Sequence, residues 1–133
     1  MSGKRDLSRL ISSMRPELAP GRFVFATIPH GQGIPAGLAP VMLFREAEGT
    51  TLIVTAEEAA QAGLAGIFPC RQITLTVHSA LDAVGFLAAV TARLAAAGIS
   101  TNAVAAYHHD HLFVPEHRAA EAVALLEAMA AVR

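Results

Sequence analysis

Residues 81–104 read "LDAVGFLAAVTARLAAAGISTNAV", and this stretch decides the fold class. Its large apolar side chains recur at the spacing of one helix face, namely Phe86, Leu87, Val90 and Leu94. Ser79 with Asp82, or Asp82 alone, is expected to cap this helix at its start, and Gly98 is expected to end it. Residues 99–107 then predict a strand. The stretch is therefore predicted to form a helix that leads directly into a strand.

The segments on either side of this helix extend the pattern. Residues 70–77 alternate apolar and polar side chains, which predicts a strand with one buried face. After the strand at 99–107, "HHD" predicts a turn, 111–115 a further strand and 116–132 a helix. The resulting order, β-α-β-β-α, lacks one strand of the βαββαβ ferredoxin-like unit. Because an unpaired edge strand promotes aggregation, we expect the missing strand to come from the other half of the chain or from a partner chain.

The N-terminal half shows the same order of elements with one helix missing. The expected elements are a short amphipathic helix at 4–14, a strand at 22–28, a long Gly- and Pro-rich loop at 29–40 and a hairpin at 41–55. The loop stands where the unit's first helix would be, and such a loop is either functional or a tolerated insertion. Thr55 and Glu58 form a T-x-x-E capping box that opens a further short helix.

These orders of elements predict an α+β fold of two ferredoxin-like half-domains. We expect antiparallel sheets with helices on one face, in an interleaved arrangement. The expected segments are 1–20 as an N-terminal helix and linker, 21–69 as the first half-domain and 70–133 as the second. This repeat is inferred from element order, because residue identity between the halves is poor.

The bulk composition excludes several classes of protein. With 53% hydrophobic and 16% charged residues the chain can bury enough apolar surface to fold, which excludes disorder. A formal net charge of −1 and an aromatic content of 5% provide neither a basic surface nor a stacking platform for nucleic acid. No run is typical of a membrane span or a signal peptide. The lone Cys70 is expected to be a buried thiol, and with no internal disulfide we expect a cytoplasmic protein.

Four histidines and an aspartate crowd into residues 106–117, "AYHHDHLFVPEH". A zinc site needs three or four converging ligands. In the predicted hairpin His109 and His111 share one face of the strand. His108 and Asp110 share the other face, so only two ligands converge. We therefore expect no metal site, no cofactor and no catalytic residue. The alternative is a metal-dependent enzyme that uses the cluster His108–His111.

The quoted stretch resembles the core of an ACT domain, a small regulatory module that binds amino acids. The resemblance rests on "D-x-x-G-F" leading into the helix and on "AGI" leading into the next strand, and it is nearest to aspartokinase regulatory domains. Residues 106–129, "AYHHDHLFVPEHRAAEAVALLEAM", resemble small stand-alone tandem ACT proteins, in which a histidine-rich turn precedes "FVP". Val84 departs from the pattern, because many ACT domains have proline at that position. The resemblance covers residues 22–130 and is strongest from residue 72 onward.

This resemblance implies a regulatory or sensor protein that binds a free amino acid or a similar small metabolite, usually where two ACT units pack side by side. The ligand-binding residues that it implies are Asp82, Ala83, Val84, Gly85, Phe86 and Leu87 in the loop, with Ser100, Thr101 and Asn102 on the facing strand. The placement is physically consistent, because a helix N-terminus favours the ligand carboxylate and Asn102 offers both a donor and an acceptor.

We further expect a homodimer without catalytic activity that acts on a protein partner in trans. The alternative is a structural module that binds a protein partner through its sheet. Neither nucleic acid nor membrane is expected as a partner.

Overall fold

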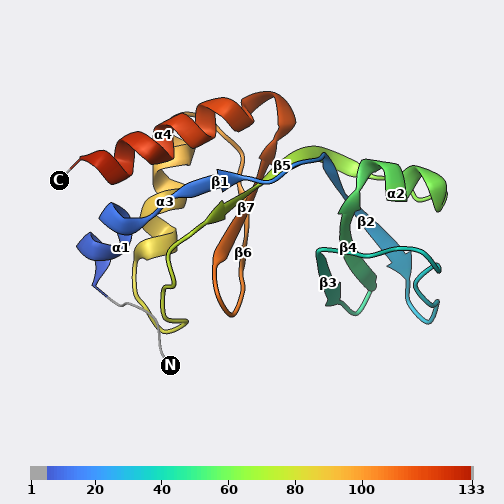
Figure 1. The fold of residues 1–133 in the computed structure, drawn as a ribbon. Helices are drawn as coiled ribbons and strands as arrows, with labels where there is room; N and C mark the ends of the chain where they lie inside the picture. Colours follow the sequence, from blue (N-terminus) through green and yellow to red (C-terminus); the bar gives the residue numbers. More distant parts are fainter. Residues whose placement is uncertain (1–5, 133) are drawn as a thin grey trace. The chain divides into compact units, whose positions relative to one another are not determined.

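The computed structural model describes residues 6–132, and these residues form two compact units. Unit 1 combines the N-terminal segment up to Pro20 with the chain from Arg71 onward, and unit 2 is Gly21–Cys70. Strand β5 (Ile67–Leu75) contributes its first residues to unit 2 and its later residues to unit 1 (Figure 1). Antiparallel strand pairing with helices occurs in both units, which confirms the predicted α+β, ferredoxin-like fold class. No helix within residues 6–132 has the length and apolar character that a membrane crossing requires.

Unit 1 contains the helix and strand of the quoted stretch. Its elements besides β5 are α1 (Leu7–Ser13), β1 (Pro16–Leu18), α3 (Phe86–Ala96), β6 (Asn102–Ala105), β7 (Asp110–Pro115), the 3-10 turn η1 (Glu116–Arg118) and α4 (Ala119–Ala131). Strand β7 lies between β5 and β6, and β1 pairs with β5. From β5 to α4 the order is β-α-β-β-α, as the sequence predicts.

The fourth strand of unit 1 comes from the N-terminal segment. Strand β1 pairs antiparallel with β5, so that Glu17 lies opposite Thr74. Directly after β1, the Ala19 N–H donates to the Gln72 carbonyl oxygen at 2.9 Å. The sequence predicts only a linker here, because Pro16–Leu18 is three residues long and offers no alternation of apolar and polar side chains. The expected interleaving is therefore made within one chain, by a segment that precedes unit 2 in the sequence.

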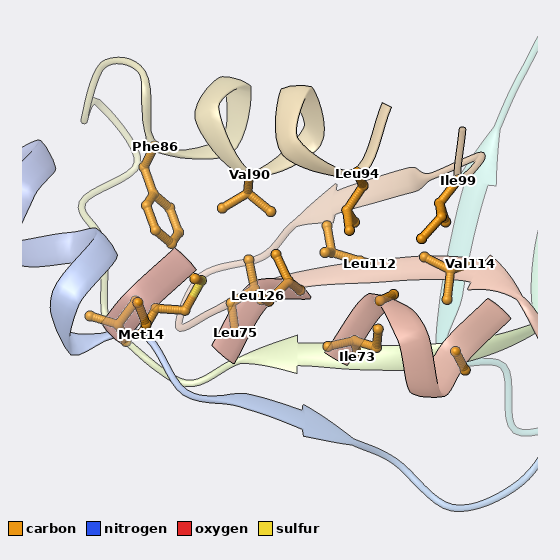
Figure 2. Close-up of a cluster of buried hydrophobic side chains, with 14 of the residues drawn as sticks. Met14, Ile73, Leu75, Phe86, Val90, Leu94, Ile99, Leu112, Val114 and Leu126 are labelled. Carbon is orange, nitrogen blue, oxygen red and sulfur yellow. The ribbon is translucent and has the colours of Figure 1, made fainter. Parts of the chain in front are cut away.

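The core of unit 1 lies between its helices and one face of its strands (Figure 2). Phe86, Val90 and Leu94 project from one side of α3 toward the strands, at the spacing that predicts this helix. The strands contribute Ile73, Leu75, Leu112 and Val114, and α4 contributes Leu126. Leu10 and Met14, in and just after α1, are fully buried in the same cluster, so the N-terminal helix is part of this core.

Unit 2 is a smaller sheet with one helix. Its elements are β2 (Phe23–Pro29), β3 (Met42–Arg45), β4 (Gly49–Thr55), α2 (Ala56–Gln61) and the first residues of β5. The strand order is β3-β4-β2-β5, and no helix stands between β2 and β3, as predicted. A separate core is formed by Val24, Ile28, Leu52, Val54 and Ala59. Cys70 is fully buried, and its thiol donates to the Phe23 carbonyl oxygen at 3.4 Å.

The predicted capping box opens α2. Thr55 Oγ1 accepts the Glu58 N–H at 3.1 Å, and Glu58 Oε1 accepts the Thr55 N–H at 3.1 Å. Glu58 Oε2 also accepts the Ala39 N–H at 2.9 Å, which fastens the long loop to the helix. The Ala39 N–H has the largest effect and the Thr55 N–H the next, and both hold the pKa of Glu58 below its usual value. One carboxylate therefore orders both a helix start and the loop beside it.

The start of α3 differs from the sequence-based prediction. The helix begins at Phe86 and not after Ser79 or Asp82, so the predicted side-chain cap is wrong. The physical reason is a turn at residues 80–83, closed by a 2.9 Å backbone hydrogen bond, which precedes the helix. Gly85 follows in the left-handed region, at φ 94°, and serves as the N-cap. This delay leaves a loop between β5 and α3.

Candidate functional site

A half-open pocket lies in unit 1 where this loop meets the start of α3. Its volume is about 170 Å³. It is lined by Ser79, Ala80, Leu81 and Ala83 of the loop, by Phe86 and Leu87 of α3, and by Ala105 and Asp110 of β6 and β7. Ala105 and Asp110 are paired across the two strands, next to the hairpin turn. The lining is therefore apolar except at Ser79 and Asp110.

Helix α3 begins at this pocket without a side-chain cap. Its N-cap residue, Gly85, has no side chain that could accept a hydrogen bond. The first N–H groups of any helix lack partners within the helix, and the first turn of α3 carries no acidic side chain. An anion beside this turn would therefore gain N–H donors and the favourable end of the helix dipole.

Asp110 is the only buried charged or polar residue among residues 6–132, with 7% of its surface exposed. The Ser79 hydroxyl donates to Asp110 Oδ2 over a long 3.4 Å. Burial raises the pKa of Asp110, while the Ser79 hydrogen bond and the nearby imidazoles of His111 and His109 act in the opposite direction. The pocket thus contains a carboxyl group whose charged form is poorly solvated.

The raised pKa of Asp110 predicts a pH dependence of stability. A carboxyl group whose pKa is higher in the folded state stabilises that state while protonated, and this contribution is lost as the pH rises through the folded-state pKa, above the ordinary value of 3.8. We therefore expect Asp110→Asn, which mimics the neutral carboxyl group, to gain in melting temperature relative to the wild type as the pH is raised from about 4 to about 7.

Thermal unfolding of both proteins over this pH range measures the difference. A difference in melting temperature that stays constant with pH would contradict the assignment of Asp110 as a buried acid.

The histidines of the turn do not converge on one point. His111 Nδ1 lies 2.9 Å from Thr74 Oγ1. Burial and, less strongly, His109 lower the pKa of His111, while Asp110 acts in the opposite direction. The ring centroids of His109 and His111 are 6.4 Å apart. Within the described part of the chain, no three His, Cys, Asp or Glu side chains are grouped so that they could hold a metal ion.

The structure brings together part of the site that the family resemblance implies. Ala83, Phe86 and Leu87 line the pocket, and Gly85 forms the helix start beside them. Asp82 and Val84 lie in the same loop without lining the pocket, and the Val84 side chain is 85% exposed.

The remaining implied residues, Ser100, Thr101 and Asn102, follow the far end of α3. Asn102 begins β6, and the last residue of that strand, Ala105, lines the pocket. Three steps of extended chain, about 10 Å, separate the two positions. Within one chain these three residues are therefore not part of the pocket.

Ser79 and Asp110 line the pocket but are absent from the set that the resemblance implies. For Asp110 the sequence contains a signal: alternation along "DHLFVP" puts it on the same face as Leu112 and Val114, which are core residues. An acid in line with two core side chains is expected to be buried. Ser79 has no comparable signal, because the path of the loop alone brings it to Asp110.

Comparison with known proteins assigns both halves of the chain to one kind of domain. Two family models described as ACT domain match the sequence, over residues 2–71 and over residues 67–128. No curated protein matches the chain. Among solved structures, a Vibrio cholerae protein of unknown function, described as a possible transport protein, is 45% identical, with a TM-score of 0.84, and the match covers 93% of this chain and 95% of that one.

More distant structures are similar in fold. A protein from Agrobacterium tumefaciens is 20% identical with a TM-score of 0.75, and the match covers 88% of this chain and 89% of that one. The regulatory subunit of aspartate kinase from Thermus thermophilus, in its ligand-free form, is 14% identical with a TM-score of 0.64, covering 86% and 95% of the two chains.

Proposed function

The chain belongs to the ACT domain family, and from this premise we propose that it is a regulatory protein that binds a free amino acid at the start of α3. ACT domains are regulatory modules that bind small molecules, which sets the class of function. The amino acid as ligand is our proposal. The observation that carries it is the 170 Å³ pocket beside an uncapped helix start.

The carboxylate that all amino acids share matches the α3 end of the pocket. The first-turn N–H groups of α3 are donors for a carboxylate, and the glycine N-cap supplies no competing side-chain acceptor. The apolar lining is suited to an aliphatic side chain, because its burial contributes about 25 cal/mol per Å² of apolar surface. Together these features support binding of a small molecule with an anionic end and an apolar end.

We further propose that the functional form is a homodimer. Ser100, Thr101 and Asn102 lie outside the pocket of their own chain, and β6 is the outer strand of the order β5-β7-β6. An outer strand has one edge of N–H and C=O groups available for pairing. In a dimer that pairs these edges, the three residues of a second copy would reach the ligand. The proposed regulatory output is a change in binding to a cytoplasmic protein partner, without catalysis by this chain.

A thermal-shift screen against the twenty amino acids at millimolar concentration tests the proposal. A ligand that binds only the folded state raises its stability by about 2.7 kcal/mol at one hundred times the Kd, which appears as a higher melting temperature. We expect at least one L-amino acid to raise the melting temperature and its D-enantiomer to raise it less. If no amino acid changes the melting temperature, the proposed function is wrong.

A further inference from the structure

We propose that Asp110, positioned by Ser79, recognises the ammonium group of the ligand, and that the pocket selects a small aliphatic amino acid of alanine to leucine size. This inference rests on the proposed function and assigns the ligand class to the same pocket. It concerns two residues, Asp110 and Ser79, that the family resemblance does not imply as ligand contacts.

The surroundings of Asp110 leave room for a cation. Its carboxylate has one side-chain hydrogen bond, the 3.4 Å bond from Ser79 to Oδ2, and none to Oδ1 from the described residues. Among residues 6–132, no lysine or arginine lines the pocket. Within residues 6–132, the charged or titratable groups that act on Asp110 are His109 and His111, on the neighbouring residues of the same hairpin. A buried carboxylate with so few partners is costly, and an ammonium ion in the pocket would offset that cost with charge-assisted hydrogen bonds.

The two ends of the pocket together match an α-amino acid. One wall is the start of α3, with Phe86 and Leu87, where a carboxylate finds N–H donors. Another wall is Asp110, on β7, where an ammonium group finds a carboxylate. An α-amino acid carries both a carboxylate and an ammonium group, so it offers a partner to each wall, whereas a 2-hydroxy acid offers only the carboxylate.

The rest of the lining limits the side chain of the ligand. Three alanines, Ala80, Ala83 and Ala105, leave space. Apart from Ser79 and Asp110, the other walls are aliphatic or aromatic. The small volume of about 170 Å³ and the short alanine side chains favour a small aliphatic amino acid such as alanine, valine or leucine over a bulkier aromatic one. A second acidic group would meet Asp110, and a second basic group would have no further partner in the lining.

Isothermal titration calorimetry of the wild type, Asp110→Asn and Ser79→Ala with L-alanine, L-valine and L-leucine tests the inference. L-Phenylalanine, L-lysine, L-glutamate and 2-hydroxyisocaproate are the comparison ligands. We expect one of the small aliphatic amino acids to bind most tightly. Replacement of leucine by 2-hydroxyisocaproate removes the ammonium group, and Asp110→Asn removes the carboxylate charge. Each change should weaken binding about 10- to 100-fold, the effect of a hydrogen bond between charged groups. Ser79→Ala should weaken binding less, because Ser79 acts through Asp110.

Two controls separate a recognition role from a structural one. Glu48→Gln removes an exposed carboxylate of unit 2 and should leave binding unchanged. Asp110→Asn without ligand should melt at or above the wild-type temperature at pH 7, which shows that weaker binding is not a consequence of unfolding.

The outcomes distinguish this inference from the proposed function. If an amino acid binds the wild type and Asp110→Asn equally well, or if 2-hydroxyisocaproate binds as well as leucine, Asp110 does not recognise the ammonium group and the inference is overturned. Preference for phenylalanine, lysine or glutamate overturns the ligand class. In each of these cases amino acid binding itself stands. If none of the twenty amino acids shifts the melting temperature in the thermal-shift screen, the proposed function is overturned as well.

Discussion

Replacement of Leu10 by alanine should destabilise unit 1 by about 2–5 kcal/mol, as for other large-to-small substitutions in a core. Leu10 is in α1 and has no exposed surface. It belongs to the same buried cluster as Val90 of α3 and Leu126 of α4, so its truncation leaves a cavity among three helices. The prediction tests whether the N-terminal segment is an integral part of unit 1.

Leu7→Ala is the matched control, because Leu7 lies in the same helix and is 39% exposed. Its truncation removes less buried surface and should cost about 1 kcal/mol or less. Urea unfolding followed by circular dichroism measures both variants, with separate transitions fitted if the two units unfold independently. Equal effects of the two substitutions would mean that α1 does not pack into the core.

Replacement of Gly49 by alanine should destabilise unit 2 by about 1–3 kcal/mol or more, the range for overpacking. A Cβ atom on Gly49 would lie 2.5 Å from the Ile28 carbonyl oxygen and 3.1 Å from Thr27 Oγ1. The carbonyl oxygen belongs to the backbone of β2, which pairs with β4 along its whole length, so it cannot move away cheaply. Relief of the clash therefore requires β4 to separate from β2 near Gly49, where β4 begins.

Gly33→Ala provides the comparison, because a Cβ atom on Gly33 meets no other atom within 4 Å. It should change the free energy of unfolding by at most about 0.5 kcal/mol. If Gly49→Ala is tolerated as well as Gly33→Ala in chemical denaturation, the close approach of β4 to β2 at this residue is wrong.

Most elements of this fold can be predicted from the sequence because their signals are local. The spacing of Phe86, Val90 and Leu94 indicates α3, and the T-x-x-E pattern locates the start of α2. The strand β1 cannot be found in this way, since three residues are too few to show a period and its partner lies far away in the sequence. The start of α3 is also missed. A turn and the left-handed Gly85 move the first helical residue beyond Asp82, which is the acid expected to cap the helix.

The candidate site is predictable only in part for the same reason. The loop residues Ala83, Phe86 and Leu87 follow from a motif that is contiguous in the sequence. Asp110 and Ser79 come together through the return of β7 beside β5, which no local pattern encodes. What the sequence does contain is the alternation that places Asp110 among core positions.

The discontinuity of unit 1 has a consequence for how the chain folds as it leaves the ribosome. Unit 2 is complete once Cys70 has emerged, whereas unit 1 needs α4, which is made last among the described helices. At ~5–20 residues per second, the synthesis of the intervening segment takes several seconds. During that time the apolar side chains of Leu10 and Met14 have no completed core to enter. We therefore expect the nascent chain to contain a folded unit 2 while α1 still exposes its apolar side chains. A chaperone that binds short apolar segments would protect the chain in this state.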